Sequence, residues 1–189
     1  MSFEDEIKKA LEVLRGGGTI LCPTDTIWGI SCDATNESAV EKIFKIKERD
    51  PFKSMIVLVD DEKWLNKYLK EVPALAWDLI EMSERPLTII YDDARGIAKN
   101  VIAADGSVAI RVCRDEFCKK LLYKFGKPMV STSANISGMS APENFNQVDE
   151  RILRDVDYVV NWRQSETSKA QASSIIRLRM NGEVEVIRK

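Results

Sequence analysis

The chain of 189 residues contains no histidine. This absence excludes Ser-His and Cys-His catalytic pairs, and it also excludes metal sites built on imidazole ligands. The four cysteines form no C-x-x-C pair, so free thiols in a reducing compartment are expected at Cys22, Cys32, Cys113 and Cys118. Chemistry in this protein must therefore rely on carboxylates, lysine, arginine, hydroxyl groups, backbone dipoles or a borrowed cation.

The sequence also lacks long apolar runs, internal repeats and low-complexity segments. No run approaches the ~18 apolar residues that span a bilayer, and the acidic start over residues 1–6 is the reverse of a secretory signal. We therefore expect a cytoplasmic protein with no membrane partner. The formal net charge is −2, with 44% hydrophobic and 31% charged residues, which is typical of a soluble domain and argues against general binding to polyanions.

Helical and strand-like patterns follow one another along the chain. Apolar residues at helical spacing predict helices near 3–15, 36–46, 61–70, 73–83, 116–125 and 147–153. Short apolar runs predict strands at 19–22, 27–30, 55–59, 87–91, 107–112, 128–131, 156–160, 173–179 and 183–188. Gly16-Gly17-Gly18 precedes a strand and lacks the ending of a phosphate loop, so we expect it to end the first helix. The pattern predicts one mixed α/β domain over residues 1–189.

Two polar segments stand where regular elements end, which is where α/β proteins place ligand-binding groups. Lys47-Glu48-Arg49 closes a helical pattern and offers two cations suited to phosphate oxygens, with Lys53 shortly after them. Ser131-Thr132-Ser133-Ala134-Asn135 closes an apolar strand and offers hydroxyls, an amide and backbone N–H groups. Together the segments predict a receptor for a phosphorylated ligand. The alternatives are a solvated charged face for the first segment and an interior turn network for the second.

Two other segments carry polar groups whose purpose the sequence leaves open. Pro23-Thr24-Asp25-Thr26 is a polar turn between two apolar strands, and it either holds a ligand or satisfies its own backbone. Arg111 lies at the end of a strand, where it is either structural or grips a carboxylate in a bidentate pair.

The order of these motifs carries more information than any of them alone. Pro-Thr-Asp-Thr-x-x-Gly, Lys-x-Arg, Ala-Ile-Arg, Ser-x-Asn-x-Ser-Gly and Ser-Ser-Ile-Ile follow one another, and from about residue 10 onward the chain resembles the YrdC-type family of L-threonylcarbamoyladenylate synthases. The resemblance implies a twisted, mixed parallel and antiparallel sheet, flanked by helices, with a large basic concave cavity. It also implies conversion of L-threonine, bicarbonate or CO2, and ATP into threonylcarbamoyl-AMP and pyrophosphate, for the t6A modification of tRNA.

The resemblance further implies roles for individual residues. The nucleotide-binding and catalytic tetrad would be Lys47, Arg49, Ser133 and Asn135. The ATP side would also include Lys53, Ser107 and Arg188. Threonine would be held by Thr26, Arg111, Ser131 and Ser173, with Arg111 on its carboxylate. Mg2+ would be bound through the phosphates rather than by protein side chains, and a downstream threonylcarbamoyl-transferase complex would take the product.

The chain departs from the usual family pattern at four places. Ser83-Glu84-Arg85-Pro86 stands where Trp-Pro-Gly-Pro is common, and Trp28 replaces tyrosine. Val112-Cys113 follows Arg111 where proline is usual after the arginine, and Asn161-Trp162-Arg163 replaces Asp-Gly-Gly. The first change concerns a wall of the expected cavity rather than the tetrad. The main alternative is an RNA-binding or regulatory protein, for example a YciO-like relative, with steep salt dependence and no ATP turnover. A small structural or adaptor domain is a third hypothesis.

Overall fold

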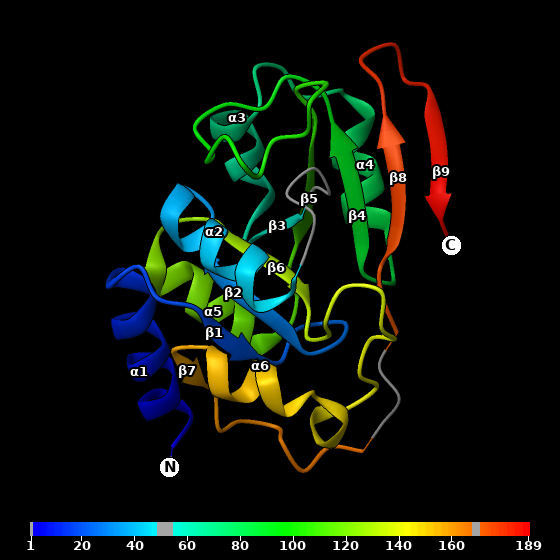
Figure 1. Ribbon diagram of the computed structural model, residues 1–189. Helices are drawn as coiled ribbons and strands as arrows, with labels where there is room; N and C mark the ends of the chain where they lie inside the picture. Colours follow the sequence, from blue (N-terminus) through cyan, green and yellow to red (C-terminus); the bar gives the residue numbers. More distant parts are fainter. Residues whose placement is uncertain (1, 49–54, 168–170) are drawn as a thin grey trace.

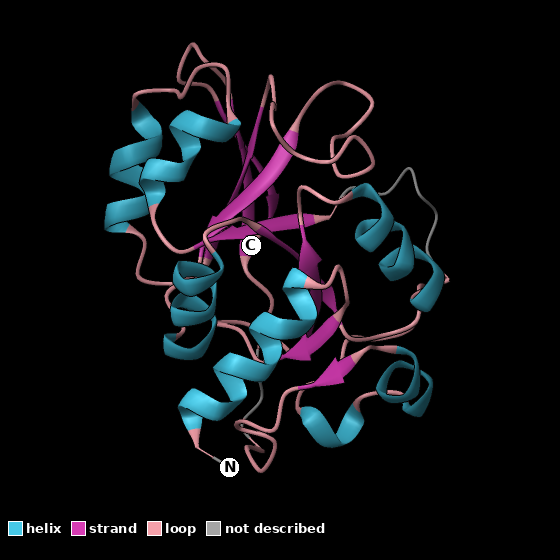
Figure 2. Cartoon of the chain, turned by 90° about the vertical axis from the view of Figure 1, so that its left-hand side faces the viewer, coloured by secondary structure: helices cyan, strands magenta, loops and turns pink. Residues whose placement is uncertain are grey.

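The computed structural model describes residues 2–48, 55–167 and 171–189. Arg49 and Lys53, both predicted on the ATP side, lie outside the described residues. The described residues form a twisted sheet with helices packed against it (Figures 1 and 2). Within this part of the chain, no helix is long and apolar enough to cross a bilayer.

The helices begin where polar side chains cap them. Ser2 and Asp5 form a reciprocal capping box at the start of α1, and the Asn36 side chain accepts from the backbone N–H of Ala39 at the start of α2. Gly16 caps the C-terminus of α1, as predicted. The α-helices are α1 (Phe3–Arg15), α2 (Glu37–Ile46), α3 (Leu65–Tyr68), α4 (Leu75–Met82), α5 (Glu116–Phe125) and α6 (Glu150–Asp155), with 3-10 turns at η1 (Glu62–Trp64) and η2 (Phe145–Gln147).

The strands form a mixed sheet, as predicted. They are β1 (Ile20–Cys22), β2 (Gly29–Asp33), β3 (Ile56–Val59), β4 (Leu87–Tyr91), β5 (Val108–Val112), β6 (Met129–Ser133), β7 (Tyr158–Val159), β8 (Ser174–Leu178) and β9 (Val184–Arg188). Their order in the described chain is β7-β1-β2-β6-β3-β5-β4-β8-β9. The pairs β1–β7, β3–β5 and β4–β8 are parallel, and the other neighbours are antiparallel.

Two predicted helices differ from those observed. The helix predicted at 61–70 is the 3-10 turn η1 followed by the single turn α3, because the Asp61 side chain accepts from the backbone N–H of Lys63 and closes a tight first turn. The helix predicted at 147–153 begins at Glu150, because Asp149 is its N-cap and accepts from the N–H of Arg151.

Side chains that alternate along the strands divide the core into two clusters. Helices α1 and α5 pack against each other and against one face of the sheet, where Ile20, Leu58 and Met129 are buried. Helix α2 contributes to the cluster on the opposite face, which includes Leu21, Val57 and Val130. In Figure 1, α1 and α5 lie toward β1 and β7 at one end of the molecule, and β4, β8 and β9 stand at the other.

Candidate functional site

A cavity of about 390 Å³ opens on the face of the sheet to which Leu58 and Met129 point. Its wall is formed by alternate residues of neighbouring strands, because successive side chains of a strand point to opposite faces. Most of the predicted site residues that the structure describes lie in this wall: Thr26, Arg111, Ser131, Ser133, Ser173 and Arg188. The structure therefore brings segments far apart in the sequence to one place.

The sheet register explains how the hydroxyl groups reach the cavity. Ser131 of β6 is opposite Ile56 of β3, which in turn is opposite Ala109 of β5. Gly29 of β2 faces the same space, and a Cβ atom at this position would lie 2.6 Å from Oγ of Ser131. A side chain at position 29 would therefore displace Ser131, and glycine keeps this part of the wall open.

Arg111 is the buried cation of this cavity. Its side chain is 4% exposed, and Nη2 lies 3.1 Å from Oδ1 of Asp25 and 3.2 Å from Oγ1 of Thr26. The contact with Asp25 is ionic rather than a well-aligned hydrogen bond, because Oδ1 has no partner of hydrogen-bond geometry among the described residues. Nε of Arg111 is also buried without a partner there. A guanidinium held on one side and open on another suits a carboxylate ligand.

The turn between β1 and β2 supplies both partners of Arg111. Oγ1 of Thr24 donates to the carbonyl of Ile27 at 2.8 Å and accepts from the N–H of Thr26 at 3.1 Å. The turn thus satisfies its own backbone, as one interpretation of the sequence predicted, while Asp25 and Thr26 point to Arg111. Sequence reasoning placed Asp25 in a polar turn but missed its contact with Arg111, for which the sequence gives no signal.

A second guanidinium, that of Arg188, lines the same cavity. Nε and Nη2 of Arg188 donate to the carbonyl of Ser173 at 2.9 and 2.8 Å, and the Ser173 hydroxyl lies 2.8 Å from that of Thr88. Burial, followed by the positive charge of Arg111, lowers the pKa of Arg188. No carboxylate is present among the described residues of the wall, so the cavity favours an anionic ligand.

Lys47 lies beside this cavity rather than in its wall. The side chain is buried, and its ammonium group donates to the carbonyl of Ser133 and, at 2.6 Å, to that of Asn135. The amide of Asn135 in turn donates to the carbonyls of Ile136 and Met139, at 3.0 and 2.7 Å. The interpretation of Lys47 as part of a solvated charged face is wrong, because only 1% of the residue is exposed.

Ser107 is another described candidate outside the cavity wall. Its hydroxyl donates to Asp105 at 2.6 Å, just before β5 begins. Ser107 is two residues before Ala109 and four before Arg111, both of which line the cavity. Ser107 itself is not part of the cavity wall.

The departures from the family pattern lie elsewhere. Ser83, Glu84, Arg85 and Arg163 line a different cavity, described below, and none of them lines the cavity that holds Arg111. Trp28 is buried, and its ring lies 4.8 Å from that of Phe145. These positions leave the wall around Arg111 intact.

The fold and the cavity define an α/β protein with a small-ligand site on one face of its sheet. Residues 12–189 match the model of the Sua5/YciO/YrdC family, whose description is telomere recombination. The chain belongs to this family.

Relatives and solved structures agree with this assignment. A protein of Methanocaldococcus jannaschii, provisionally named threonylcarbamoyl-AMP synthase, is 36% identical over 93% of this chain and 83% of its own length. The threonylcarbamoyl-AMP synthase of Pseudoalteromonas translucida is 30% identical over 97% of this chain and 98% of its own. The structure of P. abyssi Sua5 complexed with L-threonine has a TM-score of 0.81 and 25% identity over 91% of this chain, which spans half of the length of that protein. E. coli YciO shares the fold, with a TM-score of 0.83 and 22% identity over 97% of this chain and 88% of its own.

Proposed function

We propose that this protein is a threonylcarbamoyl-AMP synthase, a nucleotidyltransferase that joins L-threonine, bicarbonate or CO2, and the adenylate group of ATP, and releases pyrophosphate. The observation that carries the proposal is Arg111, a buried guanidinium that contacts Asp25 and Thr26, lines the cavity beside hydroxyl groups and has no partner at Nε among the described residues. The solved relative with bound L-threonine and the names of the sequence relatives support it. The product would serve the t6A modification of tRNA in the cytoplasm, through a downstream threonylcarbamoyl-transferase complex.

Threonine would occupy the side of the cavity near Arg111. Its carboxylate accepts hydrogen bonds from the Arg111 guanidinium, which offers donors in a planar fork. Thr26, Ser131 and Ser173 supply hydroxyl groups for the amine and hydroxyl of the substrate. Ser131 and Ser173 are buried and Thr26 is half-buried. Short side chains of this kind lose little freedom on binding, so they can hold the amine in one orientation.

ATP would occupy the side near Arg188 and the segment that follows β6. Arg188 adds positive charge there, Ser133 adds a hydroxyl, and Lys47 holds the carbonyls of Ser133 and Asn135, which fixes this segment. In this arrangement Lys47 and Asn135 affect ATP binding by holding the segment that follows β6 in one conformation. We retain Arg49, Lys53 and Ser107 as members of the ATP side.

The reaction requires positioning and charge neutralisation more than acid–base groups. The amine of threonine attacks CO2, loses one proton to solvent and becomes a carbamate; bicarbonate supplies the CO2 by losing hydroxide. A carbamate oxygen then attacks the α-phosphorus of ATP, and the bond to the β-phosphate oxygen breaks with release of pyrophosphate. Fixed cations stabilise the charge that develops on the transferred group.

The residues present do not fit a resident metal ion. Among the described residues, no group of three or more Cys, Asp or Glu side chains could hold one, and the described cavity wall contains no carboxylate. Mg2+ would therefore enter with ATP, bound to its phosphates, and we assign no step to it.

An RNA-binding or regulatory role without catalysis is less well supported. Most of the described site residues line one cavity of a size that suits small molecules rather than an extended basic surface. The formal net charge of −2 also disfavours general attraction to RNA.

The proposal is tested by measuring pyrophosphate release with each substrate omitted in turn. We expect ATP to be converted to threonylcarbamoyl-AMP and pyrophosphate only when both L-threonine and bicarbonate are present. Release of ADP and phosphate, or turnover that is independent of threonine, would exclude the proposed reaction. L-Valine, which lacks the hydroxyl group of threonine, is the matched control substrate and should react more slowly.

A further inference from the structure

A second cavity, of about 440 Å³, lies on the opposite face of β4 and β5. Ile89 and Ile110 line it, whereas their neighbours Ile90 and Ala109 line the cavity of Arg111. Thr26 borders both cavities, so the turn between β1 and β2 stands between them. The volume is within the range of small-molecule sites, roughly 300–1,000 Å³.

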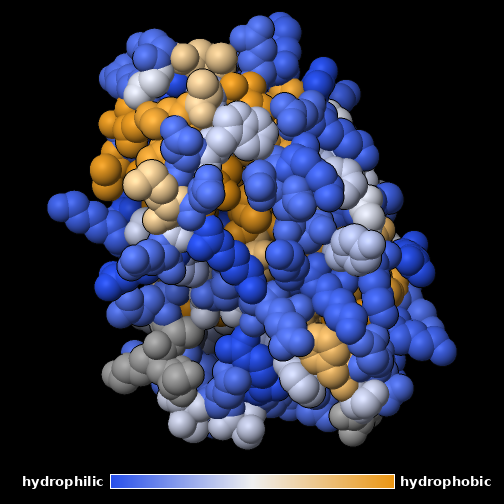
Figure 3. Space-filling model, turned by 180° about the vertical axis from the view of Figure 1, so that it is seen from behind, coloured by the Kyte–Doolittle hydropathy of each residue, from blue (hydrophilic) through white to orange (hydrophobic). Residues whose placement is uncertain are grey.

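The floor of the second cavity is apolar and consists mostly of buried side chains. Leu65, Ile89, Tyr91 and Ile110 are each at most 3% exposed, and Ile80 of α4 forms another side. In the rear view of Figure 3, hydrophobic surface is concentrated in the upper part and also appears between hydrophilic side chains near the middle. A floor of this kind favours a ligand with a compact apolar body.

Most charged groups in the wall are already engaged. The guanidinium of Arg114 donates to the carbonyls of Ser83 and Ile80, at 2.6 and 2.5 Å. Arg163 pairs with Asp115 at 2.5 Å. These charged groups already have partners and do not require a ligand. Glu84 and Arg85 also line the cavity, and both residues are exposed to solvent.

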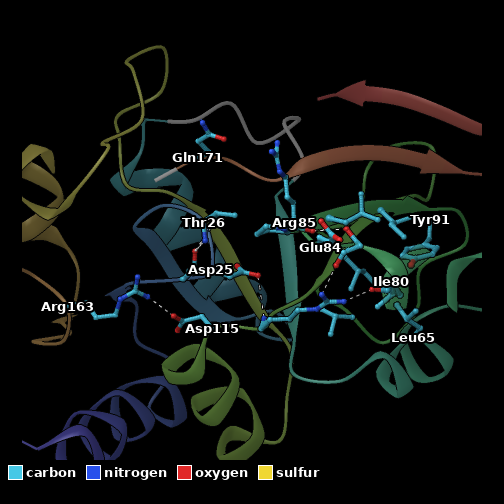
Figure 4. Close-up of a pocket in the computed structure, with 18 residues that line it drawn as sticks. Asp25, Thr26, Leu65, Ile80, Glu84, Arg85, Tyr91, Asp115, Arg163 and Gln171 are labelled. Atoms are coloured by element: carbon cyan, nitrogen blue, oxygen red, sulfur yellow. Dashed lines mark hydrogen bonds and ion pairs between the residues drawn. The ribbon is translucent and has the colours of Figure 1, made fainter. Parts of the chain in front are cut away.

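Two partly or fully buried polar groups in the wall remain open. Oδ2 of Asp25 accepts only a long contact of 3.5 Å, from the backbone N–H of Arg114. The hydroxyl of Tyr91 has no hydrogen-bond partner among the described residues, although Tyr91 is 1% exposed. In Figure 4, Tyr91 lies at one side of the cavity and Asp25 lies nearer the other, beside Thr26 and Asp115. Both groups lie in the wall of a ligand-sized cavity, where each has capacity for a further hydrogen bond to a bound molecule.

We propose that the second cavity binds a compact amine whose apolar body carries a hydroxyl group. The ammonium group pairs with the Asp25 carboxylate, the apolar body contacts Ile89 and Ile110, and the hydroxyl bonds to that of Tyr91. Arg111 pairs with Oδ1 of Asp25, so the anionic oxygen that remains for a ligand is Oδ2, which favours an ammonium over a carboxylate. The site is separate from the proposed synthase reaction and does not depend on it.

Tyramine is a suitable probe because it carries an ammonium group, an aromatic ring and a hydroxyl group. The experiment is a calorimetric titration of the full chain with tyramine, without threonine or ATP, so that it is independent of catalysis. We expect saturable binding at one site. 4-Hydroxyphenylacetate, which has a similar ring and the opposite charge, should bind at least about tenfold more weakly because it meets Asp25 as a like charge.

Two pairs of variants locate the binding. Ser83→Trp fills the cavity from a partly exposed position and should weaken tyramine binding by about tenfold or more, whereas Ser83→Ala, the matched control, should leave it unchanged. Tyr91→Phe should weaken the binding of tyramine but not the binding of phenethylamine, which lacks the hydroxyl group. Absence of saturable binding, equal binding of the carboxylate probe, or full binding by a folded Ser83→Trp variant would overturn the proposal.

Discussion

The guanidinium of Arg111 lies 3.1 Å from the carboxylate of Asp25, and the two side chains are 4% and 10% exposed. This ion pair joins β5 to the turn between β1 and β2. It fixes a cation in the wall of one cavity through a carboxylate that lines the other. The geometry of the proposed threonine site therefore depends on a residue outside its wall.

Replacing Asp25 by Asn should destabilise the protein, because Arg111 would remain buried without its counter-charge. Removing one partner of a buried ion pair costs about 3–5 kcal/mol, and the amide of Asn keeps an oxygen acceptor, so we expect a loss of about 3 kcal/mol in the free energy of unfolding. Urea denaturation measures it. Asp155→Asn removes an exposed pair with Arg154 and should change stability by less than about 0.5 kcal/mol. Equal effects of the two substitutions would contradict the role of the buried pair.

Replacing Arg111 by Lys keeps the charge but loses the fork of donors. We expect a raised KM for threonine and a nearly unchanged KM for ATP, because one substrate alone loses a contact. Arg114→Lys, on the other face of the sheet, is the control and should leave the KM for threonine unchanged. If Arg111→Lys raises the KM for ATP and leaves the KM for threonine unchanged, the threonine and ATP sides of the cavity have been exchanged in this assignment.

Replacing Lys47 by Met removes the ammonium group and keeps much of the side-chain volume. The carbonyls of Ser133 and Asn135 then lose a buried donor, which should lower the free energy of unfolding by about 1–3 kcal/mol. Because the segment they belong to faces the proposed ATP side, ATP affinity should fall as well, by roughly 1.5–3 kcal/mol. Calorimetric titration with ATP and urea denaturation measure the two effects. The exposed Lys42→Met is the control, and unchanged ATP affinity in a folded Lys47→Met variant would exclude the proposed role.

The contribution of Asp105 to stability should depend on pH. The Ser107 hydroxyl, followed by Arg177, holds the pKa of Asp105 well below its ordinary value of 3.8. The folded state therefore favours the ionised form, and this stabilisation is present above pH 3.8 and is lost as the pH falls further. The difference in Tm between the wild type and Asp105→Asn should be positive at pH 6 and should shrink below pH 4. A difference that stays constant with pH would contradict this assignment.

Local elements were predictable where the sequence carries its own signals. The helix near 3–15 ends at Gly16 as expected, and the terminal hairpin forms around Asn181 and Gly182. The helix near 61–70 was not predicted correctly, since its residues have helical spacing but a side-chain cap tightens the first turn into 3-10 form. Such a cap depends on atomic geometry that spacing alone does not encode.

The candidate site was predictable as a set of residues but not as a set of contacts. Order and type of motif pointed to Thr26, Arg111 and Ser173, and the sheet brings all three to one cavity. Strand order is set by long-range pairing, so the sequence did not indicate that Asp25 would hold Arg111. It also did not indicate the second cavity, whose wall combines α4, β4, β5 and the turn before β2.

The most direct test of the proposed reaction follows the carbon atom of bicarbonate. The protein is incubated with ATP, L-threonine and either ordinary or 13C-labelled bicarbonate, and the products are analysed by mass spectrometry. We predict threonylcarbamoyl-AMP, heavier by one mass unit with the labelled bicarbonate, together with an equal amount of pyrophosphate. ATP consumption without a labelled nucleotide product, or a threonyl adenylate that carries no bicarbonate carbon, would contradict the proposed function.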